Sequence, residues 1–184
     1  YTNTKEIYKI THQLNIPIIV DNTFLTPYLL QPLRMGADIV IHSMTKYFNG
    51  EGSFLAGAAI GPNKFIKEMR TSQTDFGNVF QSPAIAKLFY DQLETLPERM
   101  EQHIHITKEV VAYLKSDEAT QYIEKVFYPE IKDTRYNSAG AVLSFVLKGT
   151  TKKQKIEREA RLMNYFRQQE AAPQPIDLAK IEDL

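Results

Sequence analysis

Two charged residues, Lys46 and Asp21, each follow a short apolar run, and their types and spacing could support chemistry. Asp21 ends the run at residues 16–20, and Lys46 lies in the segment that follows the run at residues 37–41. Both runs are rich in β-branched residues, as buried strands of a parallel sheet are. Open α/β sheets bind ligands at the carboxyl ends of their strands. We therefore expect an amine and a carboxylate at one ligand-binding edge of a sheet.

An amine and a carboxylate in this placement are what pyridoxal phosphate requires of a protein. A lysine forms a Schiff base with the cofactor, and an acidic residue is held against its pyridinium nitrogen. The hydroxyls of Ser43 and Thr45, just before Lys46, could hold the phosphate. The spacing alone also allows a plainer interpretation, in which Lys46 is a solvated surface residue and Asp21 is only a turn or N-cap residue.

The sequence around these residues resembles a known family. Residues 21–27, 32–40 and 43–47 follow one another without an insertion. Together they closely resemble the Cys/Met-metabolism (trans-sulfuration) family of pyridoxal-phosphate enzymes, of the cystathionine γ-synthase and γ-lyase type. That family also includes cystathionine β-lyases, methionine γ-lyases and O-acylhomoserine sulfhydrylases. The resemblance extends from about Ile7 to Leu147 and is densest at residues 16–62.

The resemblance implies a role for each polar residue at the two strand ends. Lys46 would be the catalytic lysine that binds the cofactor, and Asp21 would be the partner of the pyridinium nitrogen. Thr23 would lie close to the cofactor ring, while Ser43 and Thr45 would contact the phosphate. The implied activity is that of a C–S lyase or transferase, by β- or γ-elimination or γ-replacement on a homoserine- or cysteine-derived amino acid. The resemblance also implies a homo-oligomer, either a dimer or a tetramer.

Several positions depart from the family pattern. After the lysine segment the family usually has Gly-His-x-Asp, whereas residues 50–53 read Gly-Glu-Gly-Ser. Ahead of Leu93 the family usually has Arg-Gly, whereas Asp91 and Gln92 stand here. The arginine that grips the substrate carboxylate has no identifiable counterpart. These departures favour an alternative function: a non-catalytic, truncated relic of the family that acts only through subunit contacts.

Composition excludes several other classes of protein. The 184 residues carry 22 basic and 22 acidic side chains, so no net charge draws the chain to nucleic acid or an anionic membrane. There is no cysteine, which excludes disulfides and thiol catalysis and fits a cytoplasmic location. No apolar stretch approaches the roughly 18 residues of a membrane span, and no secretory signal opens the chain. His103 and His105 lie two apart on a predicted helix and face different directions, so we expect no metal site.

The expected fold is α/β, in two parts. Residues 1–98 are predicted to be the back half of a fold-type-I pyridoxal-phosphate transferase domain with a mainly parallel sheet. The resemblance places Tyr1 well inside that domain, so its front half is expected to be absent. Residues 99–184 are predicted to form a smaller α+β C-terminal domain, incomplete or divergent after about residue 147. The predicted helices lie at residues 4–14, 28–35, 62–71, 83–115 with a break near Pro97, and 150–169, and the further strands at 54–60, 122–128 and 141–147.

Overall fold

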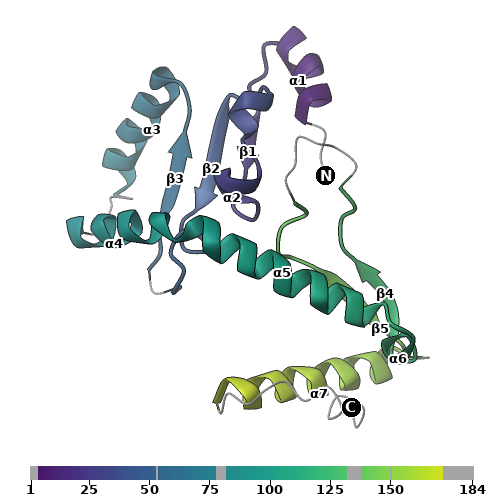
Figure 1. The fold of residues 1–184 in the computed structure, drawn as a ribbon. Coiled ribbons are helices and arrows are strands. Elements are labelled where there is room, and N and C mark those ends of the chain that lie inside the picture. Colours follow the sequence, from purple (N-terminus) through teal and green to yellow (C-terminus); the bar gives the residue numbers. More distant parts are fainter. Residues whose placement is uncertain (1–3, 53, 78–81, 132–137, 150, 172–184) are drawn as a thin grey trace. The chain divides into compact units, whose positions relative to one another are not determined.

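The computed structural model describes residues 4–52, 54–77, 82–131, 138–149 and 151–171 (Figure 1). The chain divides into two compact units, each of which is described by itself. The first unit comprises Tyr1–Lys108 and Pro129–Val142, and the second comprises Glu109–Tyr128 and Leu143–Leu184. The domain boundary predicted after residue 98 stays a prediction.

The first unit contains the predicted strand-and-helix alternation. Its elements, in chain order, are α1 (Thr4–Gln13), β1 (Ile19–Asp21), α2 (Thr26–Leu29), the 3-10 helix η1 (Pro32–Met35), β2 (Ile39–Ser43), β3 (Gly57–Ile60), α3 (Asn63–Phe76), α4 (Pro83–Glu94) and most of α5 (Leu96–Leu114). The predicted break in the long helical region is confirmed. It falls at Thr95, because Pro97 occupies the first turn of α5, where a missing N–H costs no hydrogen bond.

The three strands of the first unit form a mixed sheet in the order β1-β2-β3. β1 runs parallel to β2, with Asp21 beside Ile41, whereas β3 runs antiparallel to β2, with Gly57 beside Ser43. The expectation of a mainly parallel sheet is therefore corrected. A parallel return normally needs a crossover helix, and the described residues between β2 and β3 form turns, bends and irregular backbone but no helix. The chain that carries Lys46 stays at one edge of the sheet and turns back.

One face of this sheet carries the core. A buried apolar cluster consists of Leu29, Phe48, Leu96, Met100 and Ile104. Met100 has no exposed surface, and Phe48, two residues after Lys46, is 8% exposed. His42 lies on the same side of the sheet, with its ring centroid 5.0 Å from that of Phe48. The segment that follows Lys46 is thus anchored in the core from its second residue onward.

The opposite face of the sheet is only partly covered by α3. This helix has no buried residue, and Ile19 on β1 is 59% exposed. Two cavities of about 490 and 520 Å³ open between α3 and the strands. The smaller is lined in part by Ile41 and by Gly57, the residue that pairs with Ser43. Asp21 and Lys46 line neither cavity, so the candidate site is the sheet edge itself.

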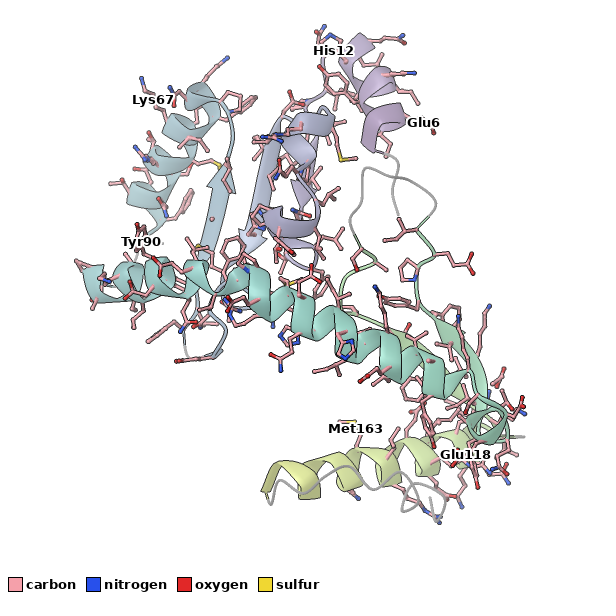
Figure 2. The ribbon with its side chains drawn as sticks, viewed as in Figure 1. Glu6, His12, Lys67, Tyr90, Glu118 and Met163 are labelled. Carbon is pink, nitrogen blue, oxygen red and sulfur yellow. The ribbon has the colours of Figure 1, made fainter. Side chains whose placement is uncertain are left out.

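The second unit contains the two predicted later strands and the final helix. Its elements are the end of α5, α6 (Asp117–Thr120), β4 (Ile123–Phe127), β5 (Ser144–Leu147) and α7 (Lys152–Ala171). β4 and β5 pair antiparallel, as a two-stranded sheet. Lys155 on α7 forms an ion pair with Glu124 on β4. The solvated helix predicted here is confirmed for the described side chains, and Figure 2 shows Met163 on it, a residue that is 53% exposed.

No helix in the described part of the chain is long and apolar enough to cross a membrane.

Candidate functional site at the carboxyl ends of β1 and β2

The last residues of β1 and β2 form the edge at which the candidate residues gather. Asp21 is the last residue of β1, and Ser43 is the last residue of β2. The two strands run parallel, and Asp21 lies beside Ile41, two residues before Ser43. A parallel pair brings both carboxyl ends to the same edge. The structure therefore places Asp21 and Ser43 as the sequence predicted, on neighbouring strands.

Thr23 links the two strand ends through one hydroxyl group. Its backbone N–H donates to Oδ1 of Asp21 at 3.0 Å, and its hydroxyl also donates to that carboxylate. The same hydroxyl oxygen accepts a hydrogen bond from the backbone N–H of Ser43 at 2.8 Å. Thr23 is only 7% exposed, so these bonds are shielded from water. Thr23 thus fixes the position of Asp21 relative to the end of β2.

The hydrogen bonds from Thr23 keep Asp21 ionised. They lower the pKa of Asp21 below its ordinary value, and the nearby His42 ring lowers it slightly further, while partial burial acts in the opposite direction. His42 is itself buried, and burial lowers its pKa, so its imidazole is neutral at pH 7. The edge therefore carries a fixed negative charge at neutral pH.

Replacing Thr23 with valine should raise the pKa of Asp21 toward its ordinary value, since the hydroxyl group that donates to the Asp21 carboxylate is lost. The folded pKa of Asp21 lies below its unfolded pKa. Its ionised form therefore stabilises the fold above the unfolded pKa, and this stabilisation is lost as pH falls through the folded pKa. NMR titration of carboxyl-labelled aspartate would measure the change. Thr74→Val is the matched control, because the Thr74 hydroxyl bonds only a helix carbonyl on exposed α3; an equal shift of Asp21 there would contradict the assignment.

Asn22 is a positioning residue that sequence reasoning missed. It is 3% exposed, and its side-chain amide donates to the carbonyls of Thr26 and Leu30 at 3.0 and 2.9 Å. Its backbone N–H donates to the carbonyl of Ile41 on β2 at 3.0 Å. Asn22 thus holds the connection to α2 against the strand end. The signal available in the sequence was an amide residue between Asp21 and Thr23, directly after a predicted strand.

Lys46 lies on a turn that begins at the end of β2. Its backbone N–H donates to the carbonyl of Ser43 at 3.4 Å, and its own carbonyl accepts from Asn49 at 3.2 Å. The backbone N–H of Met44 donates to the carbonyl of Ala56 at 2.9 Å, which ties the start of the turn to its return. The Lys46 side chain is exposed. An exposed amine on a tethered turn is free to react with a ligand at this edge.

Thr45 uses its hydroxyl to hold the same turn. Its oxygen accepts from the backbone N–H of Ala56 at 3.1 Å, and its proton faces the Ala56 carbonyl at 3.4 Å. The second of these contacts is long for an O–H donor. The hydroxyl proton can therefore turn to a phosphate oxygen while the stronger bond stays in place.

These side chains fit pyridoxal phosphate by their chemistry. Asp21 would supply a fixed carboxylate for the pyridinium nitrogen, Lys46 an accessible amine for the aldehyde, and Ser43 and Thr45 hydroxyls for the phosphate. Among the described residues, no group of three histidine or acidic side chains could hold a metal ion. The arrangement suits amine and carboxylate chemistry on a bound aldehyde cofactor.

The comparisons with known proteins identify the class to which this fold and site belong. The family model for Cys/Met metabolism PLP-dependent enzymes matches residues 1–168. The chain therefore belongs to this family of enzymes, whose cofactor is pyridoxal phosphate, and the resemblance described from the sequence is confirmed.

Two curated relatives illustrate the activities of proteins that are similar to this chain in sequence. The chain is 35% identical over 158 residues to an L-methionine gamma-lyase from Porphyromonas gingivalis, covering 80% of this chain and 39% of that protein. It is 38% identical over 144 residues to a cystathionine gamma-synthase/O-acetylhomoserine (thiol)-lyase from Bacillus subtilis, covering 78% and 35%. The chain thus spans about two fifths of the length of the curated relatives that it matches.

A solved structure shares the fold. The crystal structure of a methionine gamma lyase from Micromonospora echinospora matches with a TM-score of 0.74 and 26% identity, covering 85% of this chain and 44% of that one. The fold expected from the sequence, part of a fold-type-I pyridoxal-phosphate enzyme, is confirmed at this level.

Proposed function

We propose that the protein carrying this chain is a pyridoxal-phosphate enzyme of sulfur amino-acid metabolism. It acts at the β or γ carbon of a small homoserine- or cysteine-derived amino acid, by elimination or by replacement, as a cystathionine- or methionine-type lyase or as a γ-synthase. The observation that carries this proposal is the placement of Asp21 and the Lys46 turn at the carboxyl ends of two neighbouring parallel strands, with Thr23 between them.

Each residue of the edge has a task in this chemistry. Pyridoxal phosphate, when bound, supplies an electron sink for the charge that develops at the substrate Cα. Asp21, whose pKa is lowered by its bonds to Thr23, would hold the cofactor nitrogen in its protonated form. Lys46 would hold the cofactor aldehyde through its ε-nitrogen, and its amine would serve as the base and acid that moves the substrate Cα proton. The hydroxyls of Ser43 and Thr45 would hold the phosphate. These tasks are common to elimination and replacement.

The same proposal includes a homo-oligomer and a cytoplasmic location. The lack of cysteine fits the cytoplasmic location. The sheet face under α3 is only partly covered, and Ile19 on it is more than half exposed. Such a face needs further protein to cover it, which fits the proposed homo-oligomer.

The alternative, a non-catalytic relic, rests on the departures from the family pattern at residues 51, 53, 91 and 92. Two of these departures meet: Nε2 of Gln92 donates to Oε1 of Glu51 at 3.4 Å. This single contact does not decide between the two functions, but the intact set of Asp21, Thr23, Ser43, Thr45 and Lys46 opposes a relic, since drift would have little reason to preserve five matching polar positions. We therefore favour the enzyme.

Reduction with borohydride after addition of pyridoxal phosphate should fix the cofactor on Lys46 of the full protein. The reason is that Lys46 follows the end of β2 directly, at the edge where Asp21 and the hydroxyls would hold the rest of the cofactor. Peptide mapping would locate the label. A label spread over other lysines would refute the assignment of Lys46, and a label on Lys46 without turnover of any tested sulfur amino acid would support the relic.

A further inference from the structure

We propose that Arg99 is a positioning residue for Lys46, and that it acts by clamping the backbone of the turn that carries it. Arg99 lies in the first turns of α5, far from Lys46 in sequence. The inference rests on the proposed function, since it concerns the placement of the reactive amine.

The guanidinium group of Arg99 binds two consecutive carbonyls immediately after Lys46. Nη1 donates to the carbonyl of Tyr47, and Nη2 donates to the carbonyl of Phe48 at 3.5 Å. These are the peptide units that set the direction of the chain as it leaves Lys46. Among the described residues, Arg99 forms no ion pair with a carboxylate, and its Nη1 and Nη2 donors are directed to main-chain oxygens.

The remaining donors fix the guanidinium group itself. Nη2 also donates to the carbonyl of Gln92 at 2.9 Å, and Nε donates to the hydroxyl of Thr95 at 3.0 Å. Gln92 lies in the last turn of α4, where helix carbonyls lack partners and attract a cation. The end of α4 therefore holds Arg99 rigidly, and Arg99 holds the turn.

Gly50 allows this close approach. It adopts a positive φ of 68°, and a Cβ atom there would lie 3.1 Å from Cζ of Arg99 and 3.0 Å from Oε1 of Gln92. Each contact would be tighter than most side-chain contacts, so Arg99 and Gln92 would have to shift slightly to accommodate the added atom. The backbone of the turn thus lies directly against the guanidinium group.

Core packing from the same helix completes the clamp. Met100, the next residue of α5, belongs to the buried cluster with Phe48. One helical turn further on, the ring of His103 lies 5.5 Å from that of Tyr47. Both residues that follow Lys46 are therefore held by α5, through their side chains and through their carbonyls. A planar guanidinium fork can bind several carbonyls at once, which an ammonium group cannot.

Hydrogen exchange of the cofactor-free full protein tests the clamp directly. In Arg99→Gln, amides in residues 44–52 should exchange at least about tenfold faster, since a bond from a charged group to the turn is lost. Arg99→Lys should show a similar effect, because charge alone does not restore the fork. Arg158→Gln is the matched control: Arg158 also donates to a backbone carbonyl, that of Lys148, but in the second unit. It should leave exchange in residues 44–52 within about twofold of the unaltered protein.

Selective labelling tests the consequence for Lys46. With pyridoxal phosphate and borohydride as probe, the share of label on Lys46 should fall about tenfold or more in Arg99→Gln, because a misplaced reacting group loses rate steeply. Exchange that stays slow in residues 44–52 would overturn the clamp. Uniformly faster exchange with a lower Tm and undiminished labelling of Lys46 would also overturn the proposal, because Arg99 would then only join α4 to α5.

A milder substitution tests the clamp even if the Arg99 variants do not fold. Thr95→Val removes the acceptor of Nε and the hydroxyl that donates to the carbonyl of Gln92 at 3.2 Å, but it leaves the guanidinium group and its bonds to the turn, so both readouts should change in the same direction by a smaller factor. Unchanged readouts in both Thr95→Val and a folded Arg99→Lys would contradict the proposal. The exchange measurement needs no cofactor. If Lys46 of the unaltered protein takes no label, the proposed function fails, while exchange still decides whether Arg99 clamps the turn.

Discussion

Replacing Lys46 with alanine should lower the kcat of the full protein by about four orders of magnitude, since one amine both holds the cofactor and moves the substrate proton. The turn itself should persist, because its contacts are made by other groups: the backbone of Met44, the hydroxyl of Thr45 and the core side chain of Phe48. Steady-state kinetics on a sulfur amino acid, with far-UV circular dichroism as the check on folding, would measure the loss.

Two controls make the loss at Lys46 specific. Lys67→Ala removes an exposed lysine of α3 in the same unit (Figure 2) and should leave kcat within about twofold. Added ethylamine should restore part of the activity of Lys46→Ala but none of the activity lost by a misfolded variant. Near-normal turnover in Lys46→Ala would show that Lys46 is a solvated surface residue, the plainer interpretation that its spacing alone allowed.

The second large effect is expected at Asp21. Asp21→Asn keeps the shape of the side chain and an oxygen that can accept from the N–H of Thr23, but it removes the charge. We expect kcat to fall by about 100- to 1000-fold, the scale seen when one preorganised electrostatic partner is removed. Cofactor affinity should change much less, since Lys46 and the hydroxyls remain.

Asp38 offers a matched control for Asp21. It is the aspartate at the opposite edge of the same strands, where its Oδ2 accepts from the backbone N–H of Ile18 at 2.8 Å. Asp38→Asn should preserve kcat within about threefold, whatever it does to stability. Equal losses in the two variants would show that Asp21, like Asp38, only closes the end of a strand.

The strand ends and the residues on them could be predicted because their signals are local. Short β-branched runs followed by Asp21 and by Ser43 identify two strands and the edge where they stop. The direction of β3 could not be predicted in this way. An apolar run between glycines fits either direction, and the difference comes from the preceding connection, whose described residues form no helix.

The contacts that fix the site were not visible in the sequence because they are long-range. The bond from Ser43 to Thr23 joins positions 20 apart, and that from Arg99 to Tyr47 joins positions 52 apart. The break at Thr95 was predicted from Pro97, but nothing local to Arg99 indicates that its donors turn toward carbonyls near Lys46. Residue type and spacing located the reactive groups, while tertiary packing determines how they are held.

A single hydroxyl serves both strand ends, so these ends cannot respond to acid independently. When Asp21 takes up a proton, its carboxyl group becomes a weaker acceptor for the Thr23 hydroxyl. The Thr23 oxygen in turn becomes a weaker acceptor for the N–H of Ser43. In thermodynamic terms, protonation at the end of β1 and loosening at the end of β2 are linked in one equilibrium. Acid should therefore release the nitrogen end and the phosphate end of a bound cofactor together, as one cooperative event rather than two.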